Sequence, residues 1–185
     1  MVSLGALWIP IVLSAVIVFV ASSILHMVLP YHRSDYKRLP DEDKVLPALR
    51  AASIPRGLYV FPFCSHKEMK SPEAIQKYKQ GPVGFLVIYP PGPPALPKFL
   101  AQWFVFLLIV GFFVAYLAGR TVAFGAPYPA VFRVVGTAAF LAYGLANLAN
   151  GIWRGQPWST VTKEVIDGLI YALLTAGTFG WLWPR

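Results

Sequence analysis

The hydrophobic positions of this 185-residue chain are gathered into four long stretches, separated by one long and two short polar segments. Each stretch has about the 20 residues that a helix needs to cross a hydrocarbon layer of about 30 Å. The pattern therefore predicts four transmembrane helices. Their expected ranges are Leu7–Leu29, Phe99–Gly119, Ala130–Trp153 and Val161–Trp183.

The long polar segment, residues 30–98, is expected to be a small α/β unit. Asp41 is a candidate N-cap for a short helix through Ala52, with an interruption near Pro47. Leu58–Phe63 and Val83–Tyr89 are short apolar runs of strand length.

Ser71-Pro72-Glu73 is a typical helix start, and the helix that it opens should end at Gln80, before Gly81-Pro82. A proline-rich connector, residues 90–94, then leads into the second span. The predicted fold is an all-α four-helix membrane bundle (residues 1–29 and 99–185) with an α/β insertion. Two strands and short helices bury too little core alone, so we expect the insertion to be an assembly surface of an oligomer.

Basic residues favour one orientation. The composition is 57% hydrophobic and 13% charged, yet eleven of the 16 Lys and Arg lie in residues 30–98. With the turn 154–163, that side holds 13 basic residues against two on the other, leaving Arg133 aside. The positive-inside rule then places residues 30–98 in the cytoplasm and both termini outside. Six acidic residues are interleaved with these eleven, which argues against a nucleic-acid partner and leaves anionic lipid headgroups as the nearest one.

Small residues recur every four positions in three of the expected helices. This spacing puts them on one helix face, where backbones can approach closely. We expect tight contacts, above all between the third and fourth spans, within or between subunits. The residues are Gly111, Ala115 and Gly119; Ala138, Ala142 and Ala146; and Gly168, Ala172, Ala176 and Gly180.

Polar side chains inside the spans form a second pattern. Asp167 and Tyr171 share a face of the fourth helix, while Tyr143 and Asn147 share a face of the third, with Asn150 nearby. Both sets lie toward the cytoplasmic side, so they are expected to meet. Asp167 is then either part of a proton or ion path or, as we favour, an acid near a helix N-terminus bonded to Asn or Tyr.

Metal and catalytic signals are weak. His26, His32 and Asp35 form a candidate metal set, but His-x5-His-x2-Asp matches no strong signature, and neither does Cys64-Ser65-His66. A single cysteine excludes an intrachain disulfide. No phosphate-binding glycine loop, serine-hydrolase, zinc-protease or haem-attachment motif is present, so no cofactor is expected and an enzyme is disfavoured.

Five segments carry a family resemblance: Gly81–Phe85, Gln102–Phe104, Ile152–Trp158, Asp167–Tyr171 and Thr175–Pro184. Together they resemble a family of small, uncharacterised bacterial inner-membrane proteins with four spans. The resemblance implies a bacterial cytoplasmic membrane as the setting, and it implies no activity.

Three functional hypotheses follow. The favoured one is a non-catalytic membrane protein, a homo-oligomeric scaffold or an accessory subunit of a membrane complex. The first alternative is a small oligomeric channel or transporter that uses the polar cluster around Asp167. The second is a membrane metal or redox subunit that uses His26 and His32.

Overall fold

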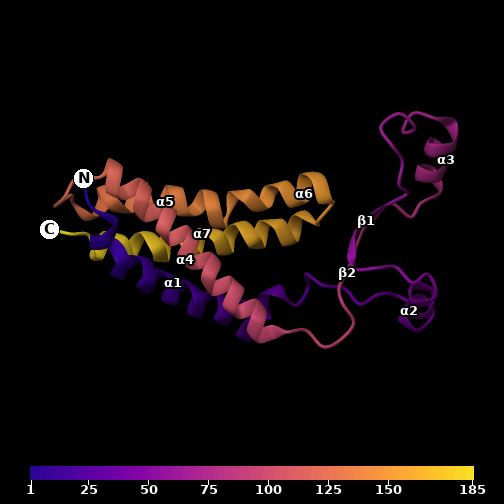
Figure 1. The fold of residues 1–185 in the computed structure, drawn as a ribbon, viewed down its shortest axis with the longest axis horizontal. Coiled ribbons are helices and arrows are strands. Elements are labelled where there is room, and N and C mark those ends of the chain that lie inside the picture. The colour runs from indigo at the N-terminus through magenta and orange to yellow at the C-terminus, as the bar shows by residue number, and fades with distance from the viewer. The chain divides into compact units, whose positions relative to one another are not determined.

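Long helices form most of the protein, which a computed structural model describes over all 185 residues (Figure 1). The chain divides into two units. Unit 1 comprises Met1–Tyr36 and Ala95–Arg185, and unit 2 comprises Lys37–Pro94.

Unit 1 contains the helical elements on both sides of the insertion. The N-terminal part has the 3-10 turn η1 (Leu4–Leu7), helix α1 (Trp8–Ser23), the π-helical turn η2 (Ile24–Val28) and the 3-10 turn η3 (Pro30–His32). The C-terminal part has α4 (Leu96–Thr121), α5 (Tyr128–Tyr143), the 3-10 turn η4 (Leu145–Asn147), α6 (Leu148–Arg154) and α7 (Trp158–Trp181).

Three helical stretches are long and apolar enough to cross a membrane, namely Leu4–Val28, Leu96–Thr121 and Tyr128–Arg154. Helix α7 is long enough but is not one of them, and it carries the charged residues Lys163, Glu164 and Asp167. The four-span arrangement therefore stays a prediction.

The third predicted helix is not continuous. Helix α5 ends at Tyr143, and the 3-10 turn η4 separates it from α6. The side-chain amide of Asn147 donates to the carbonyl of Tyr143 (2.9 Å), which satisfies an acceptor at this break. Gly155 ends α6 in the left-handed conformation (φ 66°), where glycine is favoured.

The helices of unit 1 pack as a bundle. α7 packs against α5 and α1, and α4 packs against α1 and α5. The closest approach is between α5 and α7, where a Cβ atom on Gly168 would overlap the backbone of Gly144. Both chain ends lie at the same end of the bundle (Figure 1), where the Val2 amide donates to Gly119 O (2.8 Å).

The small-residue stripes differ in their burial. The stripes on α4 (Gly111, Ala115, Gly119) and on α7 (Gly168, Ala172, Ala176, Gly180) are buried. The α5 stripe is not, since Ala138 is half-buried and both Ala142 and Ala146 are exposed. The buried face of α5 lies beside that stripe and consists of Val131, Val135, Ala139 and Tyr143.

Unit 2 contains α2 (Glu42–Ala51), β1 (Gly57–Phe61), α3 (Pro72–Gln80) and β2 (Gly84–Ile88). The two strands pair antiparallel, with Gly57 opposite Ile88 and Phe61 opposite Gly84. Ala74 is the only buried residue of the unit, in line with the small core expected from the sequence.

Two details of unit 2 correct the sequence prediction and one confirms it. The Asp41 side chain makes no capping bond, because Asp41 has a left-handed backbone (φ 48°) instead of the extended one that a cap needs. Pro47 lies inside α2, which stays continuous although proline has no backbone N–H to donate to the preceding turn. Ser71 does cap α3, and its Oγ accepts from the Ala74 amide at 3.1 Å.

Candidate histidine–carboxylate site

The candidate site lies in unit 1, where the turns η2 and η3 meet α7. His26 lies in the π-helical turn η2, and Pro30 begins the 3-10 turn η3 that ends at His32. The backbone becomes extended at Leu29 between the two turns, and the two imidazole rings stack with centroids 4.0 Å apart. Asp167 reaches the histidines from α7.

Three ligand-type atoms converge at this point. The Nε2 atom of His32 lies 2.8 Å from Oδ2 of Asp167, and Nε2 of His26 lies 3.5 Å from the same oxygen. One ligand atom from each residue lies within 4.8 Å of the others. Two metal–ligand bonds of about 2.1 Å span at most about 4.2 Å, so both contacts to Asp167 are short enough for a shared ion.

Asp35 fixes the orientation of His32. The Nδ1 atom of His32 lies 2.6 Å from Oδ2 of Asp35. Burial alone would raise the pKa of Asp35, but hydrogen bonds from Lys163 and His32 outweigh it and hold that pKa below its ordinary value. An ionised carboxylate accepts only, so Nδ1 carries the proton that it donates to Asp35.

Lys163 joins the histidine turn to α7. Its ammonium donates to the carbonyl of Tyr31 (2.7 Å), to Oγ of Ser34 (2.8 Å) and to Oδ1 of Asp35 (2.7 Å). It also lies over the Tyr31 ring, 5.2 Å from its centroid. Because Lys163 precedes Asp167 by one helical turn, this contact holds His32 against the carboxylate.

The centre of the cluster is buried and polar. The side chain of Asp167 is only 4% exposed and that of His32 only 10%. Oδ2 of Asp167 contacts the Nε2 atoms of both histidines, forming an ion pair with whichever ring is protonated, whereas its Oδ1 atom has no hydrogen-bond partner. A buried carboxylate is strongly unfavourable without a positive partner, so the cluster needs a positive charge at its centre, which either a proton on a histidine or a bound cation supplies.

Two further buried polar atoms belong to the same helix as Asp167. Oε2 of Glu164 and the hydroxyl of Tyr171 lack hydrogen-bond partners. The other carboxylate oxygen of Glu164 accepts from Nε2 of Gln156 at 2.6 Å. These two atoms and Oδ1 of Asp167 are therefore the buried polar atoms of α7 that lack a hydrogen-bond partner.

The structure regroups the residues singled out in the sequence. Asp167 lies against His26 and His32, and not against the asparagines. Asn147 bonds its own helix, and the carbonyl of Asn150 accepts from the Gln156 amide (3.3 Å).

The rings of Tyr143 and Tyr171 do meet, with centroids 6.0 Å apart. Asp35 contacts the other nitrogen of His32 and does not join the ligand group. From the sequence, Lys163 contributes only to the charge count, although its position four residues before Asp167 places both residues on the same face of α7.

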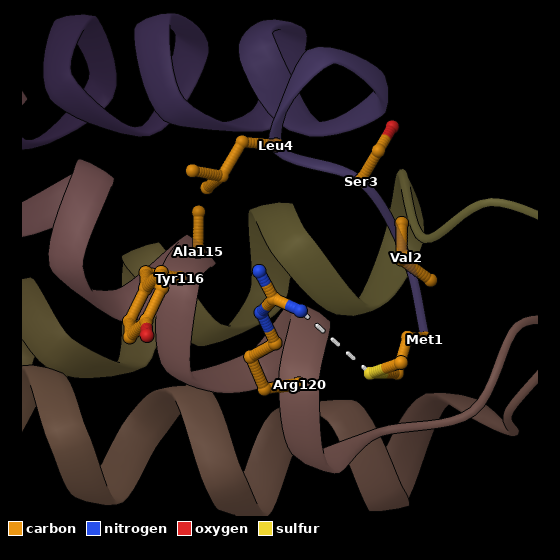
Figure 2. A pocket seen from close by; sticks show the side chains of 7 residues that line it. All are labelled: Met1, Val2, Ser3, Leu4, Ala115, Tyr116 and Arg120. Atoms are coloured by element: carbon orange, nitrogen blue, oxygen red, sulfur yellow. Dashed lines mark hydrogen bonds between the residues drawn. The ribbon is translucent and has the colours of Figure 1, made fainter.

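A hollow at the other end of the bundle offers different chemistry. It has a volume of about 340 Å³ and is lined by apolar side chains together with Ser3, Tyr116 and Arg120 (Figure 2). The Arg120 guanidinium lies over the Tyr116 ring, and its Nη1 atom donates to Sδ of Met1 at 3.8 Å. No histidine or carboxylate lines this hollow, so the histidine–carboxylate cluster is the stronger candidate site.

The fold and the site define a helical protein with three helices of membrane-crossing length and a His2Asp cluster at one end of its bundle. No protein-family model, curated protein or solved structure matches this chain. The resemblance to small bacterial inner-membrane proteins therefore stays a prediction.

Proposed function

We propose that this protein is an integral membrane metal-binding protein that holds a divalent first-row transition-metal ion at His26, His32 and Asp167. The observation that carries the proposal is the pairing of Asp167 with His32. A buried carboxylate oxygen and an imidazole nitrogen face each other at 2.8 Å, and either a proton on the nitrogen or a metal ion bound to both atoms can stabilise this contact. With Nδ1 of His32 donating to Asp35, Nε2 presents a lone pair, and a metal cation satisfies both atoms at once.

The donor set favours a transition metal. Imidazole nitrogens suit Zn²⁺, Fe²⁺ and their neighbours, whereas Ca²⁺ and Mg²⁺ prefer oxygen ligands. Asp35, hydrogen-bonded to Nδ1 of His32, corresponds to the outer-sphere carboxylate that commonly orients a metal-binding histidine. Three protein ligands leave a coordination position for water or substrate, which is typical of reactive sites and unlike closed structural ones.

This proposal develops the second alternative of the sequence analysis, a membrane metal or redox subunit that uses His26 and His32. It is compatible with an accessory subunit of a membrane complex, because such a subunit can carry the metal. The structure supports the channel hypothesis less well, since Asn147 and the backbone of Asn150 take part in bonds near the end of their own helical segment.

We place the site at the cytoplasmic face of a bacterial inner membrane, with four spans and both termini outside. The distribution of Lys and Arg supports this orientation. Burial of the polar residues of α7 among its neighbouring helices supports its inclusion as a fourth span, because a charged side chain is tolerated in a membrane when it faces the bundle interior.

The test is metal titration of the purified full-length protein in detergent after treatment with a chelator. Calorimetry with Zn²⁺ and visible absorption with Co²⁺ should show one bound ion per chain. We expect His32→Gln and Asp167→Asn to lower the affinity by at least about 100-fold, and Asp35→Asn by about 10- to 100-fold.

His66 provides the matched control, because it is the one histidine outside the cluster. His66→Gln should bind the metal as the unaltered protein does. Far-UV circular dichroism checks that each variant stays helical. Absence of stoichiometric binding by a helical protein, or equal binding by all variants, would overturn the proposal.

A further inference from the structure

One face of the β hairpin in unit 2 is entirely apolar and exposed. The strand register pairs Leu58 with Val87 and Val60 with Phe85. Cross-strand partners, and residues two apart in a strand, point to the same side of a sheet. These four side chains are 41% to 64% exposed, so together they form one uncovered surface, the hairpin face.

Nothing within unit 2 covers the hairpin face. Neither α2 nor α3 buries a large apolar side chain, and Ala74 is the only buried residue of the unit. Phe63, Val83 and Tyr89, next to the strand ends, are also exposed. An apolar surface of this kind marks an interaction site in a native protein.

A groove beside the hairpin has a complementary polarity. It measures about 560 Å³, and its lining includes Leu46, Leu49, Arg50, Ile54, Arg56 and Ile88. Two guanidinium groups next to apolar walls suit an anionic headgroup with an attached hydrocarbon chain, because arginine binds phosphate oxygens in pairs.

We propose that unit 2 docks on anionic phospholipid with the hairpin face against the bilayer, and that the arginines of the groove, at the Gly57–Ile88 end of the strand pair, contact headgroups there. Residues 37–94 contain nine Lys and Arg against five Asp and Glu, a net charge of +4. A second copy of unit 2 would bring the same charge and be repelled, whereas an anionic bilayer attracts it. The proposal depends on the membrane setting and not on the metal site.

Chain connectivity gives the bilayer a further advantage over other partners. Unit 2 is inserted between two stretches of membrane-crossing length, Leu4–Val28 and Leu96–Thr121. A segment attached at both sides to membrane helices meets the lipid surface at a high effective concentration. A soluble partner has to be captured from solution.

The test uses the full-length protein with Cys64→Ser and one new cysteine, Val60→Cys, carrying an environment-sensitive fluorophore. The protein is reconstituted into vesicles of phosphatidylcholine alone or with phosphatidylglycerol, and resistance to carbonate extraction verifies insertion. We expect a blue shift and quenching by nitroxide-labelled lipids in the anionic vesicles, and much less in the neutral ones. The same label at Glu73→Cys, an exposed position on α3, should respond weakly.

Charge variants separate the groove from net charge. Replacing Arg50 and Arg56 by glutamine should weaken the affinity for anionic vesicles about fivefold for each arginine. This is the typical contribution of one basic residue to binding at an anionic surface. Replacing Lys67 and Lys70, which lie outside the groove, removes the same charge and should weaken docking less than replacing the two arginines does.

Three results would overturn the proposal. One is equal quenching at position 60 in neutral and anionic vesicles, and another is no quenching in protein that resists extraction. The third is a disulfide between two unlabelled Val60→Cys chains whose yield rises with the protein-to-lipid ratio, since a second copy would then cover the face. Equal effects of the arginine and lysine pairs would overturn the role of the groove.

Discussion

The two units of this chain are stabilised in different ways. In unit 1, buried faces of α1, α4, α5 and α7 pack against one another around close backbone contacts. In unit 2, helix ends, turns and a five-residue strand pair are formed with almost no buried side chains. Most of the packing energy of the protein therefore comes from contacts between the helices of unit 1. Unit 2 has local order only and depends on contact with a surface outside itself.

Polar groups follow the same division. Unit 1 buries Asp167 against His26 and His32 and leaves its Oδ1 atom without a hydrogen-bond partner. The charged contacts of unit 2 are exposed, as between Arg38 and Glu42 or between Ser65 and Glu68. Exposed ion pairs contribute little energy, whereas a buried cluster of titratable groups is a candidate functional site. We therefore assign chemistry to unit 1 and surface recognition to unit 2.

The largest expected effect comes from Gly168→Leu. A Cβ atom at this position overlaps the backbone of Gly144, which cannot move aside as a flexible side chain does. We expect separation of α5 from α7 and a loss of about 4 kcal/mol or more in the free energy of unfolding of unit 1. Thermal unfolding in detergent, followed by circular dichroism, measures it.

Gly177→Ala is the control for that variant. Its Cβ atom would meet only the Tyr128 hydroxyl at 3.6 Å, an ordinary contact, so alanine should be neutral or stabilise α7 by about 0.5–1 kcal/mol. If Gly168→Leu and Gly177→Ala have the same free energy of unfolding, close packing of α5 on α7 is not what stabilises unit 1.

Metal addition should sharpen the contrast between the units. On the proposed function, a free Zn²⁺ concentration about 100 times the Kd raises the free energy of unfolding of unit 1 by about 2.7 kcal/mol. Hydrogen exchange should slow in η2, η3 and the first turns of α7, and stay unchanged in α2 and α3. Equal protection of both units would contradict a site confined to unit 1.

The sequence predicts the long helices because apolar stretches of this length have few alternatives. It predicts α3 equally well, since Ser71-Pro72-Glu73 is a local signal that needs no tertiary contact. It fails at the break after Tyr143, where the close contact between Gly144 and Gly168 belongs to two helices at once. No local pattern contains such a contact.

The candidate site was predicted in pieces. His26 and His32 were one candidate set and Asp167 was part of another, because they are separated by more than 130 residues of sequence. Spacing rules detect ligands that share a turn or helix, and here the ligands meet only because η3 follows the extended Leu29 and α7 packs on α1. Lys163 was missed as a structural contact for the same reason.

The smallest expected effect tests unit 2 by itself. Ser71→Ala removes the Oγ atom that accepts from the Ala74 amide, and a lost N-cap costs about 1 kcal/mol. Because unit 2 lacks a core to hold α3 in place, this loss should appear as faster hydrogen exchange across Pro72–Gln80, with no change in the unfolding of unit 1. Gln76→Ala, an exposed position within α3, should leave that exchange nearly unaltered. Should Ser71→Ala lower the Tm of unit 1 as well, the two units fold together, and the contrast between them lies in burial alone.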